Sequence, residues 1–153
     1  MAIRLNDLPD RIRQAIGRQL AARPAKTKAA TEPAHILVTL PLPERNLHPN
    51  ARIHHHAKAK ITKQARLRAM LAATEATGGN KWRWKTAMAE YRFHLPDKRR
   101  HDLDGLLSAC KAYQDGIVDA GVLEDDHGIE EIRLTRCIDK QNPRVTIMVK
   151  KLK

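Results

Sequence analysis

Residues 86–95, TAMAEYRFHL, alternate regularly between apolar and polar side chains. Successive side chains of a β-strand point to opposite faces of a sheet, so this alternation predicts a strand that is buried on one face. The two faces would carry Ala87, Ala89, Tyr91, Phe93 and Leu95 on the buried side, and Met88, Glu90, Arg92 and His94 on the other. A sheet is therefore one layer of the expected fold.

Three further segments have the pattern of strands. Residues 35–42 place Ile36, Val38 and Leu40 on one face, and a pair of prolines ends the run. Strands are also predicted at 129–138 and 144–151, where a turn at 141–143 would join them into a hairpin.

Two segments between these strands have helical spacing. Residues 62–77 would begin at Thr62 as N-cap and end at the glycines of 78–80. Residues 103–120 would end at Gly121. The faces expected to be apolar are Leu67, Met70, Leu71 and Thr74 in the first helix, and Leu106, Cys110, Tyr113 and Ile117 in the second. The order βαβαββ predicts an α/β (α+β) fold with a small mixed sheet and helices.

The N-terminal part of the chain is expected to be separate. Residues 1–22 have an apolar residue at every fourth position and predict an amphipathic helix, and an Ala-, Pro- and Lys-rich linker follows it. We therefore expect a helix and linker over 1–33 and a compact domain over 34–153. The start of the chain lacks the apolar stretch of a secretory signal, no apolar run reaches 18 residues, and Cys110 and Cys137 do not form a disulfide framework. These features favour a cytoplasmic protein.

Charge is the strongest indication of a partner. The chain has 29 Lys and Arg against 17 Asp and Glu, for a formal net charge of +12. A small domain with this imbalance attracts polyanions, and nucleic acid is the usual one. The alternative is a small basic protein, such as a ribosomal one, in which the charge serves another purpose.

Two acidic motifs stand out against this positive charge. In RRHDLDG, residues 99–105, Asp102 and Asp104 are two positions apart and would point to the same side of an extended segment. Two adjacent carboxylates are costly unless a cation lies between them, and Mg²⁺ prefers such oxygen ligands. In LEDDHG, residues 123–128, Asp125 and Asp126 stand where a helix gives way to a strand. Either motif alone is also explained by helix capping or by a solvated turn.

These two motifs do not meet automatically. A helix of about five turns between them spans roughly 27 Å. Asp104 and Asp126 would meet only if the chain doubles back or if a partner subunit closes the site.

Residues 97–129, DKRRHDLDGLLSACKAYQDGIVDAGVLEDDHGI, resemble the RusA-type Holliday junction resolvase family. They contain, in order, a basic run, a DLD element, a helix with a Lys, an AG step and a DD pair before a strand. The resemblance extends over roughly 35–151, where a strand ending in LPLP leads into a basic loop and a helix. It implies an α/β fold and a homodimeric, magnesium-dependent enzyme that cleaves four-way DNA junctions, often encoded by a phage or prophage.

The resemblance also implies roles for particular residues. Asp102 and Asp104 match the aspartates of the family's DLDN element, and Asp125 and Asp126 match its DD pair. The family's catalytic lysine falls on Lys111 when the comparison is anchored on the DD pair. Anchored on DLDN, it falls on Ser108 instead, because this chain has about one extra helical turn between the motifs. Gly105 stands where the family usually has Asn.

The expected site follows from these matches. Asp102, Asp104 and Asp126 would be catalytic metal ligands with Asp125 auxiliary, Mg²⁺ would be the cofactor with Mn²⁺ as a substitute, and Lys111 would contact the scissile phosphate or water. Asp115, four residues after Lys111, is expected to be its structural ion-pair partner. The residues expected to bind DNA are Lys98, Arg99, Arg100, Arg45, Arg52, Lys58 and Lys60.

Three smaller groups of residues each allow two interpretations. His54, His55 and His56 are consecutive, and contact with DNA is favoured over a transition-metal site. For Trp82 and Trp84, packing within the protein is the favoured interpretation, and stacking on exposed bases of DNA is the alternative. His101 and His127 adjoin the acidic motifs and would either tune the site or be merely exposed.

The sequence therefore predicts an endodeoxyribonuclease that resolves four-way junctions in recombination and repair, as a homodimer in the cytoplasm of a bacterial or phage-infected cell. The alternatives are a non-catalytic basic DNA-binding protein on the same fold, or a metal nuclease acting on other branched DNA or on RNA.

Overall fold

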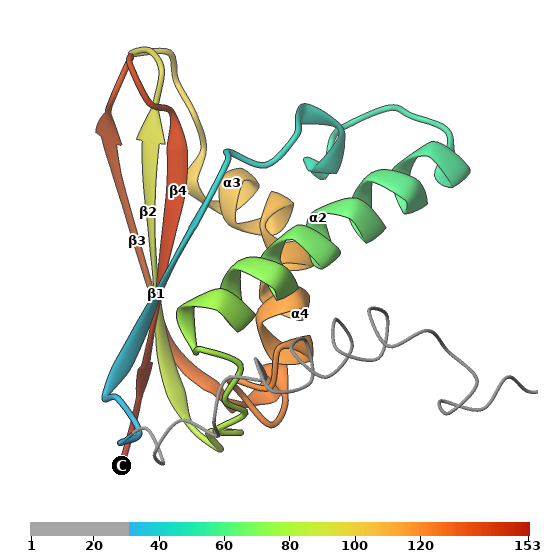
Figure 1. Cartoon of the computed structure of the whole chain (residues 1–153). Coiled ribbons are helices and arrows are strands. Elements are labelled where there is room, and N and C mark those ends of the chain that lie inside the picture. The colour runs from blue at the N-terminus through green and yellow to red at the C-terminus, as the bar shows by residue number, and fades with distance from the viewer. Residues whose placement is uncertain (1–30) are drawn as a thin grey trace, which may run out of the picture. The chain divides into compact units, whose positions relative to one another are not determined.

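The structure is a computed structural model that describes residues 31–153, drawn in colour in Figure 1. The helix expected at 1–22 and most of its linker lie outside the described residues. Residues Pro33–Lys153 form one compact unit. Its elements are β1 (His35–Leu40), η2 (Arg45–Leu47), α2 (His55–Ala76), β2 (Ala87–Leu95), α3 (Leu103–Ala109), α4 (Lys111–Asp119), η3 (Asp126–Gly128), β3 (Ile129–Ile138) and β4 (Arg144–Lys151). This order confirms the predicted α+β class.

The four strands form one mixed sheet in the order β1-β4-β2-β3. β4 runs antiparallel to both β1 and β2, whereas β3 runs parallel to β2. The hairpin predicted between β3 and β4 is therefore wrong, because β2 lies between them. β2 and β4 carry most of the buried positions, whereas β3 is exposed along nearly its whole length, as suits an edge strand. The segment after β3 crosses the end of β2, where the Asp139 N–H donates to the carbonyl of Leu95.

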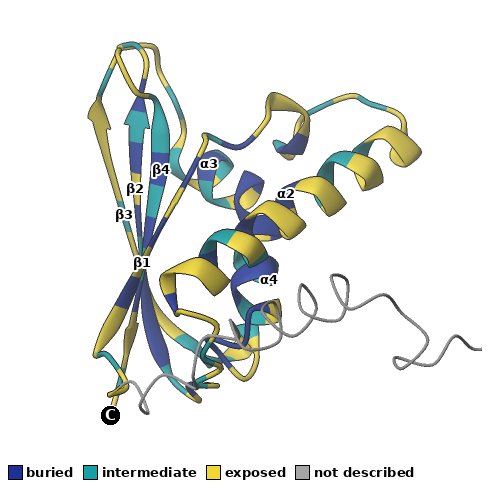
Figure 2. Ribbon diagram, viewed as in Figure 1, coloured by how far each residue is buried: buried dark blue, intermediate teal, exposed yellow. Residues whose placement is uncertain are grey.

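The helices cover one face of this sheet (Figure 1). The predicted inward residues of β2 are all at most 3% exposed, and the same holds for Val38 and Leu40 in β1 and Val145, Ile147 and Val149 in β4. Tyr91 and Phe93 are the large aromatic side chains of the sheet's buried face. The alternation therefore identified the face that meets the helices, but Met88, expected on the other face, is also buried, at 6% exposure. Figure 2 shows the buried residues in dark blue along the strands and on the helices that cover them.

The helix predicted at 62–77 starts earlier and buries a different face. α2 begins at His55 after His54 as N-cap, so Thr62 is not the cap. The residues that face the core are Ala65, Ala69 and Ala73, while Leu67 and Leu71 are 51% and 59% exposed. α2 packs closely on α4 at Gly116, where an added Cβ would lie 2.2 Å from the carbonyl oxygen of Arg66. Only small side chains fit so close a crossing, which is why the alanines and not the leucines point inward.

The helix predicted at 103–120 is two helices that meet at Cys110. The Cys110 N–H lies within hydrogen-bonding range of the carbonyls of Leu106 and Leu107, and the Cys110 carbonyl accepts from Tyr113 and Gln114. The helical path is interrupted there, at φ −84° and ψ 0°. The expected apolar face is nevertheless buried, with Leu106, Cys110, Tyr113 and Ile117 at 4%, 1%, 1% and 2% exposure. Gly121 ends α4 with φ +80°, as predicted.

Within residues 31–153, none of the helices combines the length and the apolar character needed to cross a membrane.

Candidate functional site

Asp102 and Asp104 lie at the start of α3. Asp102 is the N-cap residue in extended conformation, but its side chain makes no capping hydrogen bond. Asp104 lies in the first turn, where the partial positive charge of a helix N-terminus favours an acid. Neither carboxylate forms an ion pair with a described residue. Helix capping therefore does not account for the Asp102 carboxylate.

The two aspartates line one depression of about 420 Å³ together with His48. His48 comes from the loop after β1, so the depression joins two distant parts of the chain. Gly105 lies between them, where an added Cβ would meet Asp102 Cβ at 3.8 Å and His48 Nδ1 at 3.9 Å, both ordinary contacts. Burial, helped by the nearby His101 and Arg45, lowers the pKa of His48 from its ordinary value. The His48 imidazole beside the carboxylates is a feature that sequence reasoning missed, because nothing in the local pattern marks His48.

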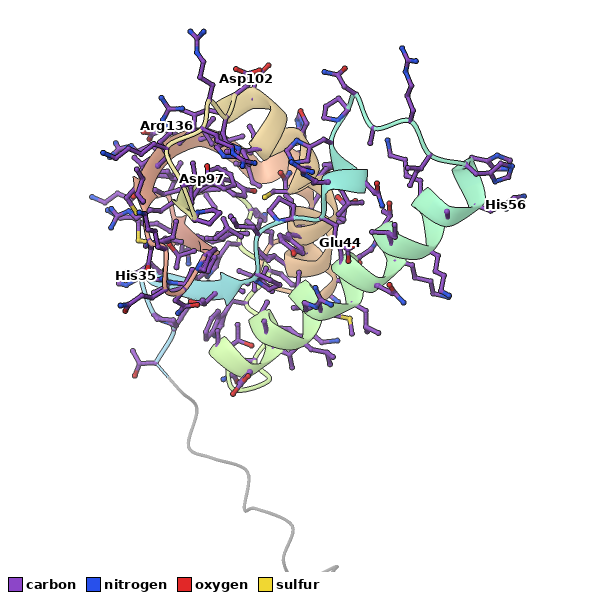
Figure 3. All side chains as sticks on the ribbon, turned by 90° about the horizontal axis from the view of Figure 1, so that it is seen from above. His35, Glu44, His56, Asp97, Asp102 and Arg136 are labelled. Carbon is purple, nitrogen blue, oxygen red and sulfur yellow. The ribbon has the colours of Figure 1, made fainter. Side chains whose placement is uncertain are left out.

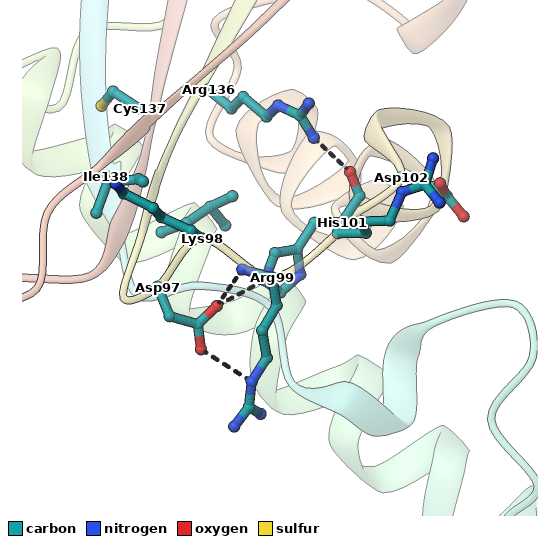
Figure 4. Close-up of a pocket in the computed structure, with 10 residues that line it drawn as sticks. Asp97, Lys98, Arg99, His101, Asp102, Arg136, Cys137 and Ile138 are labelled. Atoms are coloured by element: carbon teal, nitrogen blue, oxygen red, sulfur yellow. Dashed lines mark hydrogen bonds and ion pairs between the residues drawn. The ribbon is translucent and has the colours of Figure 1, made fainter.

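A second depression of about 620 Å³ adjoins the first (Figure 4). The two share Arg100, His101 and Asp102 among their lining residues, and we call them together the acidic–basic groove. The further lining residues of the second depression are Leu95, Asp97, Lys98, Arg99, Arg136, Cys137 and Ile138. The predicted basic cluster Lys98, Arg99 and Arg100 thus lies beside Asp102.

Contacts within the 97–102 loop hold the basic side of this groove in shape. An Asp97 carboxylate oxygen accepts the Arg99 N–H at 2.9 Å, which is the main reason that the pKa of Asp97 is lowered. Arg136, near the end of β3, donates to the carbonyl of His101 at 2.9 Å. Asp97 and Arg136 were not among the predicted site residues. Arg136 had no sequence signal, because its place depends on the pairing of β3 with β2.

Lys111 and Asp126 are in direct contact. The Lys111 ammonium pairs with the Asp126 carboxylate and lies 3.0 Å from that of Asp115. The hydrogen bond to Asp126 is the main cause that raises the pKa of Lys111, and the same bond lowers the pKa of Asp126. The predicted pairing of Lys111 with Asp115 is confirmed. The chain after α4 therefore doubles back far enough to bring Asp126 to the first residue of that helix.

The three predicted metal-ligating aspartates do not form one cluster within a single chain. Asp126 lines a smaller depression of about 210 Å³ with Arg66, Asp115, Val118 and Asp125, and neither Asp102 nor Asp104 borders it. Asp125 accepts the Asp126 N–H at 2.6 Å and so has a turn-forming role as N-cap of η3. The carboxylate oxygens of Asp102 and Asp104 have the chemistry for Mg²⁺, whereas Asp126 is engaged by Lys111.

The three consecutive histidines lie at the start of α2 and are exposed. Their nearest ligand atoms all lie within 4.8 Å of one another, which among residues 31–153 is the one such group of three found. Figure 3, which labels His56, shows this end of α2 far from Asp102 and Arg136. The remaining predicted DNA contacts lie along the same part of the chain. Of Arg45, Arg52, Lys58 and Lys60, Lys58 is partly buried and the others are exposed.

The two tryptophans pack as expected. Trp84 is 2% exposed and stacks on the partly buried Trp82 with ring centroids 5.6 Å apart. His127 follows Asp126 in η3, where it is exposed.

No protein-family model matches the chain. It is similar to an uncharacterized protein of Xylella fastidiosa (strain Temecula1 / ATCC 700964), with 36% identity over 94 residues. The match covers 58% of this chain and 59% of that relative. This relative's description names no activity, so the resemblance to RusA-type resolvases stays a prediction.

Proposed function

We propose that this protein is a magnesium-dependent endonuclease that resolves four-way DNA junctions by paired, symmetric phosphodiester hydrolysis. One observation carries the proposal. The acidic–basic groove places the cationic loop of Lys98, Arg99 and Arg100 next to two carboxylates, Asp102 and Asp104, that have no cationic partner among the described residues. Cations that can bind a phosphate backbone, next to unpaired acids that can hold a metal ion, suit metal-dependent phosphodiester hydrolysis.

The charge balance supports a metal in this groove. Two carboxylates in one depression repel each other, and acids beside DNA weaken its binding unless a cation neutralises them. Their oxygen atoms are the ligands that Mg²⁺ prefers. Bound there, Mg²⁺ would supply an activated water and stabilise negative charge on the reacting phosphate.

Each protein residue then has a task. Lys98, Arg99 and Arg100 bind backbone phosphates and set the position of the DNA. Lys111 supplies a positive charge for the reacting phosphate or orients the water, and it is held by Asp115 and Asp126. Asp126 is the third acidic residue of the site, with Asp125 auxiliary. In our proposal the enzyme acts in the cytoplasm of a bacterial or phage-infected cell, in recombination and repair.

A homodimer suits this reaction. Resolving a junction requires two symmetric cuts, and a two-fold axis provides two identical sites. A homodimer would also let Asp126 of the partner subunit, together with the lysine it pairs with, approach Asp102 and Asp104.

The test compares a synthetic four-way junction with a linear duplex of the same sequence, incubated with Mg²⁺, with Mn²⁺ or with EDTA. We expect paired symmetric nicks on the junction alone, and none with EDTA. Binding without cleavage in both metals would overturn the proposal.

A non-catalytic DNA-binding protein is the second candidate. It is favoured by one observation, the separation of Asp126 from the depression that holds Asp102 and Asp104. The same experiment decides between the two, since this candidate predicts junction binding without nicks. Flap and RNA substrates of matched length, added to the assay, test the third alternative of a nuclease for other branched DNA or for RNA.

A further inference from the structure

Residues 45–74 contain no acid, although Asp and Glu make up 17 of the chain's 153 residues. The same stretch has four histidines and seven cations, which are Arg45, Arg52, Lys58, Lys60, Lys63, Arg66 and Arg68. A stretch of this length with positive charges and no negative ones attracts polyanions such as nucleic acid.

The first part of this stretch projects from the fold. In α2 the buried residues are Ala65, Ala69 and Ala73, so no residue of this helix before Ala65 is buried. Figures 1 and 2 show the start of α2, with the loop that leads into it, extending away from the sheet as a mostly exposed segment. We call residues 51–64 the basic arm. None of its residues is buried.

The cations of the basic arm lack local partners. Arg66, just beyond the arm, pairs with Asp119, but Arg52, Lys58, Lys60 and Lys63 form no ion pair with any described residue. The first turn of α2 has no acid, and it starts instead with histidines and Lys58. A helix N-terminus favours negative charge, so this choice of residues weakens the helix rather than stabilising it. A bound polyanion would reverse that effect.

The basic arm and the acidic–basic groove are separate surfaces. The groove is built from the 97–102 loop, the start of α3, the end of β3 and residues 48–50 of the loop after β1. The arm is built from the end of that loop, residues 51–54, and the start of α2. Figure 3 places His56 on the opposite side of the molecule from Asp97 and Arg136. Two cationic surfaces in different directions suit a substrate whose helical segments also diverge.

We propose that the basic arm binds the phosphate backbone of a second duplex segment while the acidic–basic groove holds the segment to be cut. This inference rests on the proposed function in taking branched DNA as the substrate. It makes the arm a determinant of structure selectivity, because a linear duplex engages the groove alone. The contact is to backbone phosphates and carries no sequence preference.

The test uses the full-length chain with Lys58, Lys60 and Lys63 changed to Glu. These lysines form no ion pair with a described residue, and an acid near the start of α2 suits the helix dipole, so we expect the variant to fold and to melt no lower than the parent protein. The matched control changes Lys85, Lys150 and Lys153 to Glu, which alters the net charge equally at exposed positions near the other end of the sheet from the groove. Fluorescence anisotropy in EDTA measures the Kd for a four-way junction and for a linear duplex of the same sequence.

We expect the arm variant to raise the Kd for the junction by at least about 10-fold, and the Kd for the duplex by less than about 3-fold. The slope of log Kd against log salt for the junction should fall by about 0.9 for each lost phosphate contact. The control variant should change both Kd values alike and only slightly.

Equal losses for junction and duplex, or a control that matches the arm variant, would overturn the inference. So would unchanged junction binding combined with loss of binding to phosphatidylserine vesicles, which would assign the arm to a membrane surface. Because binding is measured without metal, the result is independent of cleavage. Absence of nicks in the cleavage assay would remove the proposed nuclease function and leave the arm's role in binding open to this test.

Discussion

Lys111 Nζ contacts Oδ2 of Asp126, 15 residues further along the chain, and it does so from the first residue of α4. The contact joins the helical lysine to the second aspartate of the DD pair. Ser108, the other position that the family comparison allows, lies in α3, on the far side of the interruption at Cys110. Lys111 is therefore the position that contacts the DD pair, while neither Lys111 nor Ser108 lines the acidic–basic groove.

Replacing Lys111 by Ala should slow junction cleavage by about 100- to 1000-fold, the usual effect of removing one charged donor from a transition state. Ser108→Ala should cleave at the parental rate. Single-turnover cleavage with saturating enzyme measures both, so that a change in DNA affinity does not enter. Loss of cleavage in the serine variant alone would place the functional residue in α3 instead.

Asp104→Asn should separate binding from cleavage. The substitution keeps the shape of the side chain but removes the negative charge that a metal needs, so cleavage should fall by at least about 100-fold while the junction Kd stays the same or decreases. Binding by anisotropy and cleavage on the same DNA give the two values. Glu124→Gln, an exposed acid outside the groove, is the control. Retained cleavage in Asp104→Asn would exclude Asp104 as a ligand.

The sequence predicted where the strands of this fold lie along the chain better than it predicted how they are arranged in the sheet. Alternation located β2, β3 and β4 to within a residue, because side-chain direction in a strand is local. Which strands become neighbours depends on contacts between distant parts of the chain. The short connector after β3 would allow a hairpin with β4, but in the sheet β2 lies between β3 and β4.

The error in α2 has a similar origin. Periodicity gives weight to large side chains, and so it selected Leu67 and Leu71 over the alanines. The deciding contact is made by a residue far away, Gly116, whose missing side chain lets α2 come close. In the candidate site, the aspartates and the basic loop were visible as motifs, whereas His48 and Arg136 reach it only through tertiary structure.

Gly116→Ala should destabilise the fold. The added Cβ would lie 2.2 Å from the Arg66 carbonyl oxygen and 2.8 Å from Ala69 Cβ, so α2 and α4 must move apart. Overpacking of this kind typically costs about 1–3 kcal/mol, and a clash with backbone belongs at the upper end. Gly105→Ala is the matched control in a helix, where the new Cβ meets only ordinary contacts and helix propensity favours Ala by about 0.5–1 kcal/mol. Urea unfolding of both variants measures the difference, and equal stabilities would contradict the close crossing.

The ion pair between Arg66 and Asp119 should make stability depend on pH in the acid range. Arg66 Nη2 donates to Asp119 Oδ1 at 2.7 Å, linking α2 to α4, and this bonding lowers the pKa of Asp119 from its ordinary value of 3.8. A carboxyl whose pKa is lower in the folded than in the unfolded state binds protons more readily when unfolded. Its stabilising contribution is therefore present above the ordinary pKa and is lost as the pH falls through the lower, folded value.

Asp119→Asn should accordingly lower the melting temperature at pH 7 and reduce the difference in melting temperature between pH 5 and pH 2. The remaining dependence belongs to Asp97, Asp126 and Asp139, whose pKa values are also lowered by their partners. Glu124→Gln, which removes an acid that forms no ion pair with a described residue, should leave the pH profile as it is. Thermal unfolding followed by circular dichroism across this range measures all three proteins. A profile for Asp119→Asn parallel to that of the parent chain would show that the Arg66–Asp119 contact does not persist in solution.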